Sequence, residues 1–123
     1  MESIGRQWYQ LYENNPKIQA FAVVKDHEIV WQTENWNLVE DLKGIMKAQE
    51  TAGSKLTVGG VKYKRISSSK DSYIASADKD GGHLLMAQID SGVWAIAWAV
   101  ASAVPELAMV DLTKSAISLR GAI

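Results

Sequence analysis

The first apolar positions of the chain recur with the spacing of a helix. The pattern i, i+4, i+7, i+8 is followed by four side chains, Ile4, Trp8, Leu11 and Tyr12. Ser3 is suited to cap this helix, and Asn14-Asn15-Pro16 is suited to end it, because proline cannot continue a helix. Two apolar runs follow, at residues 18–24 and 29–31, separated by a polar turn. They predict a β-hairpin.

A second helix is predicted between residues 37 and 53. Asn37 and Glu40 form a sequence typical of a capping box, and Gly53 is a typical stop signal. Its inner face consists of Leu38, Leu42, Ile45, Met46 and Gln49.

From residue 56 to residue 99 the hydrophobic period changes to two. Turn residues at 59–60, 67–71, 80–82 and 90–92 divide this stretch into four or five short strands. Pro105 then suits the first position of a last helix. The inner seam of that helix has alternating three- and four-residue spacing and comprises Met109, Leu112, Ala116, Leu119 and Ile123.

The order of elements predicts one α+β domain over residues 1–123. Strands joined by tight turns pair antiparallel, which indicates a central sheet of five to seven strands. The helices at the two ends of the chain have apolar seams that they can bury only on that sheet.

Composition narrows the class of protein. The chain has 123 residues, 47% of them hydrophobic and 22% charged, and a net charge of −1, which provides no general attraction to nucleic acid or to an anionic membrane. The absence of cysteine excludes disulfides and thiolate metal sites and favours a reducing compartment. The longest apolar run, residues 93–101, is too short to span a bilayer, and no secretory signal is evident. We therefore expect a cytoplasmic protein.

No pattern in the sequence calls for catalysis. His27 and His83 are the two imidazoles, and both are expected in solvated turns. The segment 78–82 lacks the glycine and glutamate spacing of a helix-loop-helix calcium site, and the segment 57–62 lacks the spacing of a phosphate-binding loop. We predict a non-enzymatic protein without a metal or a cofactor.

Several ordered motifs resemble the profilin family. Leu56-Thr57-Val58-Gly59-Gly60-Val61-Lys62-Tyr63-Lys64-Arg65-Ile66 is similar to a strand-turn-strand segment of that family. Val30-Trp31-Gln32, Gly44-Ile45-Met46-Lys47 and Asp80-Gly81-Gly82-His83 resemble further stretches in the same order. The resemblance implies an antiparallel sheet with the N- and C-terminal helices on one face and the other helix on the opposite face.

The resemblance also implies the partner and the residues that contact it. Profilins bind actin monomers, regulate polymerisation and promote nucleotide exchange, and they are cytoskeletal proteins. The positions of this chain that match their actin-facing surface are Lys62, Arg65, Tyr73, Glu106, Met109, Val110 and Lys114. Tyr63 and Arg65 share one side of a period-two strand, which favours an exposed aromatic and cationic patch. Solubilising charge is the competing interpretation of the lysines and of Arg65.

Two further ligands follow from the same resemblance. Eukaryotic profilins bind proline-rich peptides through stacked aromatic side chains, and the matching positions here are Trp8, Tyr9, Tyr12 and Trp31. The end of the last helix offers Ser118 and Ile123 where the family has aromatic or histidine residues, so core packing is the competing interpretation. Family members also bind phosphoinositides, for which Lys62, Lys64 and Arg65 form a small basic patch.

Two other functions compete with an actin-binding monomer. A roadblock- or longin-like scaffold has a similar outline, and it dimerises or docks on small GTPases. Trp94 and Trp98, on one side of the same predicted strand, would form its dimer surface, whereas burial under the last helix is the alternative. A small ligand-sensing domain would line a pocket with Trp8, Trp31 or Trp36.

Overall fold

The computed structural model describes the backbone of residues 2–123 and the side chains of residues 4–123. One antiparallel sheet has the strand order β2-β1-β7-β6-β5-β4-β3. The elements are α1 (Glu2–Asn14), β1 (Ile18–Lys25), β2 (Glu28–Gln32), α2 (Leu42–Thr51), β3 (Lys55–Val58), β4 (Val61–Ser69), β5 (Ser72–Ala77), β6 (His83–Asp90), β7 (Val93–Ala99) and α3 (Pro105–Leu119). This order confirms the predicted α+β class.

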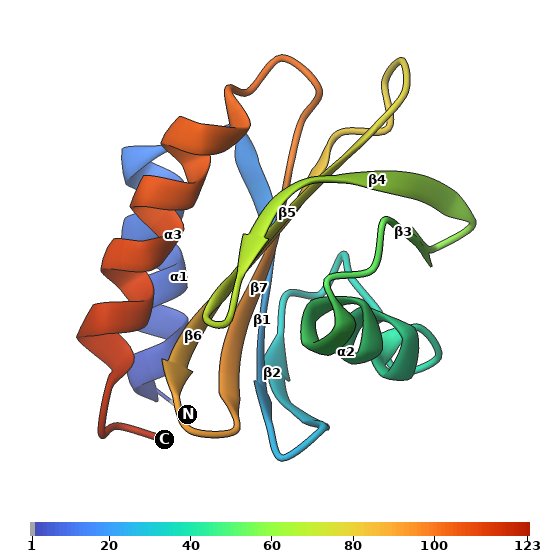
Figure 1. Cartoon of the computed structure of the whole chain (residues 1–123). Coiled ribbons are helices and arrows are strands. Elements are labelled where there is room, and N and C mark those ends of the chain that lie inside the picture. The colour runs from blue at the N-terminus through green and yellow to red at the C-terminus, as the bar shows by residue number, and fades with distance from the viewer. Residues whose placement is uncertain (1) are drawn as a thin grey trace.

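The helices cover the two faces of the sheet separately. Helices α1 and α3 lie together on one face, and α2 lies on the other (Figure 1). Successive residues of β1 serve opposite cores, since Phe21 packs toward α1 and α3 whereas Ala22 packs toward α2. The central strands are therefore apolar on both faces, which explains the continuous apolar run of β1.

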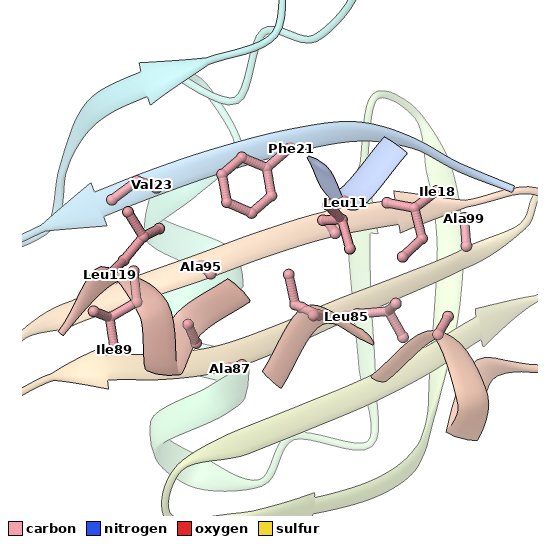
Figure 2. Close-up of a cluster of buried hydrophobic side chains, with 14 of the residues drawn as sticks. Leu11, Ile18, Phe21, Val23, Leu85, Ala87, Ile89, Ala95, Ala99 and Leu119 are labelled. Atoms are coloured by element: carbon pink, nitrogen blue, oxygen red, sulfur yellow. The ribbon is translucent and has the colours of Figure 1, made fainter. Parts of the chain in front are cut away.

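The core beneath α1 and α3 is made of aliphatic side chains around one aromatic ring. Figure 2 shows Leu11 of α1, Leu85 of β6 and Leu119 of α3 gathered with Phe21. Phe21 and Leu85 are fully buried. The predicted seams of the first and last helices are confirmed where they reach this core, at Ile4, Leu11, Leu112, Ala116 and Leu119.

The second core lies between the sheet and α2. Its largest side chains include Ile45, Met46, Tyr73 and Ile96. Trp94 is buried in this core, at 6% exposure. The predicted burial of Trp94 is confirmed, but the covering helix was wrong, because even-numbered positions of β7 face α2 and not α3.

The boundaries of the helices differ from the predicted ones. Helix α2 begins at Leu42 and not near Asn37, because the Asn37 side chain accepts a hydrogen bond from the backbone of Val39 and stabilises a turn. The left-handed residue that ends α2 is Ala52, at φ +52°, one residue before the expected Gly53. Helix α1 begins at Glu2, so Ser3 lies within it and not at its cap.

Most of the tight turns agree with the predicted ones, but β4 extends to Ser69, so the turn expected at residues 67–71 is confined to residues 70 and 71. Gly59 and Gly60 have φ values of +58° and +80°, as a two-residue hairpin between β3 and β4 requires. The Asp41 carboxylate accepts a 2.9 Å hydrogen bond from the Gly59 backbone N–H, which ties this turn to the start of α2. None of the described helices is long and apolar enough to cross a bilayer.

Candidate protein-interaction surfaces

Lys62 lies in a basic hollow near one end of the sheet. Strand β4 places Lys62 and Lys64 on the side of the sheet that carries α3, because Lys64 pairs with Ser76 and the same side of β5 bears Ile74 of the α1–α3 core. The hollow has a volume of about 360 Å³ and is also lined by Lys55. Sequence reasoning found Lys62 and Lys64 but did not place Lys55 beside them.

Arg65 lies on the opposite side of the sheet from Lys62. It is exposed, and it pairs with Ala75, whose side chain belongs to the α2 core. The Arg65 guanidinium donates a 3.0 Å hydrogen bond from Nη1 to the Ala52 carbonyl, just beyond the end of α2. Arg65 is therefore accessible, but one of its donors is engaged within the chain.

The expected aromatic contribution to this surface is corrected by the structure. Tyr73 is fully buried and Tyr63 is 3% exposed, so neither ring can reach a partner. Both rings point toward α2, the covered face of this part of the sheet. Burial raises the pKa of both phenols, and for Tyr73 the positive charge of Arg65 acts in the opposite direction.

Helix α3 presents most of its predicted contact residues to solvent. Glu106, Val110 and Lys114 are exposed, whereas Met109 is half-buried against the core. Val110 is flanked by Leu107 and Ile117, with 64% and 52% exposure, on the outer side of the helix. Sequence reasoning missed these two residues, although their spacing from the buried seam places them outside it.

An aromatic groove runs beside α1 at the edge of β2. It is open, has a volume of about 780 Å³, and is lined by Trp8, Tyr12 and Trp31 with polar residues of the segment after β2. The Trp8 ring lies 5.5 Å from the Tyr12 ring and stacks on Phe21 at 6.0 Å between centroids. Trp8 and Trp31 thus pack on the core, as one interpretation expected, and they also line a groove.

Tyr9, the fourth predicted aromatic residue, points elsewhere. Its side chain is 63% exposed and does not line the groove. A hydrogen bond with Glu13, followed by the charge of that carboxylate, raises the pKa of Tyr9. The structure therefore brings together three of the four residues.

The furrow between α1 and α3 is polar. It is lined by side chains such as Gln7, Gln10, Ser115 and Ser118. The Asp111 carboxylate accepts 3.0 Å hydrogen bonds from Asn14 and from Asn15, which close one end of the furrow. None of the residues that line this furrow is aromatic.

The features that motivated other functions are engaged inside the fold. Trp94 is buried, and the half-buried Trp98 donates a 3.0 Å hydrogen bond from Nε1 to the Gly81 carbonyl, so the described strand does not offer the pair as a dimer surface. His27 is exposed in the β1–β2 turn, as predicted. His83 begins β6 instead of lying in a turn, and its ring contacts Ser76 Oγ and the Ala101 carbonyl. No group of metal-binding side chains occurs among the described residues.

Comparison with known proteins gives a consistent picture. The chain is 35% identical to Thor profilin of a Thorarchaeota archaeon over 109 residues, which cover 86% of this chain and 85% of the relative. It is 32% identical to Loki profilin-2 of Lokiarchaeum over 81 residues, 59% of this chain and 60% of the relative. In a solved complex of Loki profilin-2 with rabbit actin, the matching chain superimposes with a TM-score of 0.92 at 27% identity, over 100% of this chain and 99% of that one. No family model matches the sequence.

Proposed function

The chain belongs to the profilin family, and from this premise we propose that it binds monomeric actin through the side of the sheet that carries α3. The observation that carries the proposal is the full-length match to a relative solved in complex with actin. The chemistry of the exposed residues supports it. Lys62 and Lys64 supply positive charge, and Val110 supplies apolar area on α3, the helix that packs on the same side of the sheet.

We propose a contact surface smaller than the one expected from the sequence. It comprises Lys62, Glu106, Val110 and Lys114, with Met109 at its margin. Tyr73 is excluded by its burial. Arg65 lies on the other side of the sheet, beside the end of α2, and we propose it as a peripheral contact.

The proposed consequence of binding is control of actin assembly. A monomeric, cytoplasmic protein that occupies one surface of an actin monomer restricts how that monomer joins a filament. It also changes how readily the monomer exchanges nucleotide, if it binds the nucleotide-free form more tightly. No bond is made or broken by this protein in either process.

A polymerisation assay with pyrene-labelled actin tests this proposal. We expect the protein, in excess over actin, to slow spontaneous assembly and to alter the release rate of a fluorescent nucleotide from actin monomers. Val110→Asp should weaken both effects at least about tenfold, because it places a charge in the apolar part of the contact. The matched control Val39→Asp changes another exposed valine, in the segment before α2. Unchanged assembly and exchange with a folded wild-type sample would refute the proposal.

We propose proline-rich peptides as ligands of the aromatic groove. The groove offers Trp8, Tyr12 and Trp31, flat rings of the kind that pack against a polyproline II helix. Tryptophan fluorescence during titration with a decaproline peptide is the direct test. An affinity unchanged in Trp31→Ala, with Trp8 still reporting from the groove, would assign the binding to another place on the chain.

A further inference from the structure

The register of β3 and β4 gathers three lysines on one face of the sheet. Lys55 lies directly opposite Lys64, and Thr57 lies directly opposite Lys62. Side chains of directly opposed residues have Cβ atoms about 5 Å apart. Leu56 and Tyr63, the alternate residues, point into the α2 core, so all three lysines point to the other face. We call the hollow lined by Lys55, Leu56, Thr57, Lys62, Tyr63, Lys64, Ser76 and Asp78 the lysine cavity.

The charge of the lysine cavity is not balanced within the described part of the chain. Three lysines and one aspartate line it, for a formal charge of +2. Among the interactions of the described residues, none pairs Lys55, Lys62 or Lys64 with a carboxylate within salt-bridge distance, and the nearby acidic side chain that lines the cavity is Asp78. Like charges placed directly opposite each other destabilise a sheet, so the Lys55–Lys64 pair is repulsive until an anion enters.

Two of the other lining residues can form hydrogen bonds with an oxygen-rich ligand. Thr57 and Ser76 contribute hydroxyl groups, and the Ser76 hydroxyl is positioned by its hydrogen bond with His83 Nδ1. The cavity of about 360 Å³ admits one or two side chains and their water. None of its lining residues is an arginine, so the cavity offers hydrated point charges, which pair with carboxylate or phosphate oxygens without the two-point geometry of a guanidinium.

The position of the cavity connects it with the proposed actin contact. Lys62 belongs to both, and the cavity opens on the same side of the sheet as α3. We propose that the lysine cavity receives a carboxylate-bearing segment of the actin monomer, with Lys55 and Lys64 as contact residues in addition to Lys62. This inference rests on the proposed function and adds the chemistry by which the partner is recognised. A localised positive hollow on a chain of net charge −1 acts on the rate of association more than on the final packing.

The test is the association rate with actin monomers in the double variant Lys55→Glu/Lys64→Glu. We expect it to fall about tenfold or more at low ionic strength, and the difference from wild type to shrink as salt screens the charges. The matched control is Lys43→Glu/Lys47→Glu, which makes the same charge change at exposed positions of α2, on the other face of the sheet. The control should associate like wild type. Circular dichroism of each variant checks that it is folded, and the single variant Lys64→Gln should show a smaller loss.

The outcomes separate this inference from the proposed function. If wild-type protein binds actin and the lysine variant associates equally fast, the inference is wrong and the proposed function stands. If wild-type protein does not bind actin, both are wrong. Vesicles containing a phosphorylated inositol lipid, and inorganic phosphate alone, form a second arm of the experiment. Loss of vesicle or phosphate binding in the lysine variant, with actin association unchanged, would make the cavity a phosphate site and overturn the proposal.

Discussion

Arg65 of β4 and Tyr73 of β5 were both predicted to contact a partner, yet their side chains bind the segment that follows α2. The Tyr73 hydroxyl donates a 2.5 Å hydrogen bond to the Gly53 carbonyl, and Arg65 donates to the neighbouring Ala52 carbonyl. Carbonyl groups at a helix C-terminus lack partners within the helix. These two side chains supply partners from β4 and β5 and so fix the segment between α2 and β3.

We predict that Tyr73→Phe lowers the free energy of unfolding by about 1–2 kcal/mol, because it leaves a carbonyl without its donor while the ring still packs. Urea unfolding followed by circular dichroism measures the loss. Tyr12→Phe is the control, since it removes the hydroxyl of a 44% exposed ring and should change stability by less than about 0.5 kcal/mol. Equal stability of the two variants would show that the Tyr73 hydrogen bond contributes nothing.

At the scale of elements, the carboxylate of Asp111 links α3 to the end of α1 by two hydrogen bonds. Asp111 of α3 accepts hydrogen bonds from Asn14 and Asn15 at the end of α1, 97 and 96 positions away in the sequence. Hydrogen bonds to an ionised acceptor are stronger than those between neutral groups. The two amides therefore hold the C-terminal end of α1 against α3, beside the polar furrow.

We predict that Asp111→Ala destabilises the protein by about 1–2 kcal/mol and increases the rate of amide hydrogen exchange in α1 more than in the sheet. Exchange followed by mass spectrometry would locate the effect. Glu40→Ala, which removes an exposed carboxylate ahead of α2, should leave the exchange of α1 as in wild type. An increase spread evenly over the chain would contradict a local clasp.

At the scale of the whole molecule, one sheet is shared by two cores. β1, β6 and β7 each contribute side chains to the cluster under α1 and α3 and to the cluster under α2. Opening either core exposes strands that the other core needs. We therefore propose that residues 1–123 unfold as one cooperative unit, as expected of a single domain of this size.

We predict that thermal unfolding gives one transition, with coincident midpoints by circular dichroism and by tryptophan fluorescence. The tryptophans report on both sides of the sheet, since Trp8 and Trp31 pack beneath α1 and α3, whereas Trp36, Trp94 and Trp98 pack on the α2 side. Fluorescence that changes at a lower temperature than helicity would contradict a single unit.

The sequence by itself determined the order of elements, most of the turns and the seams of the helices. These features depend on residues close together in the chain. The turn at Gly59-Gly60 requires positive φ values, which glycine adopts readily, and the buried side of α3 follows from the helical spacing of its apolar residues. The start of α2 differs from the predicted one because the Asn37 side chain bonds to the Val39 backbone in a turn, an alternative to capping a helix.

Only the tertiary structure decided which face each strand residue occupies and which charges meet. Both faces of the sheet are covered along its central strands, so an apolar side chain such as Tyr73 or Trp94 gives no sign of which helix it faces. In β4, the pairing shifts between Arg65 and Ser67, and this bulge ends the simple alternation counted from the turn. Lys55 lies opposite Lys64 because of the register between β3 and β4. Register is a property of the strand pair, so neither segment shows it alone.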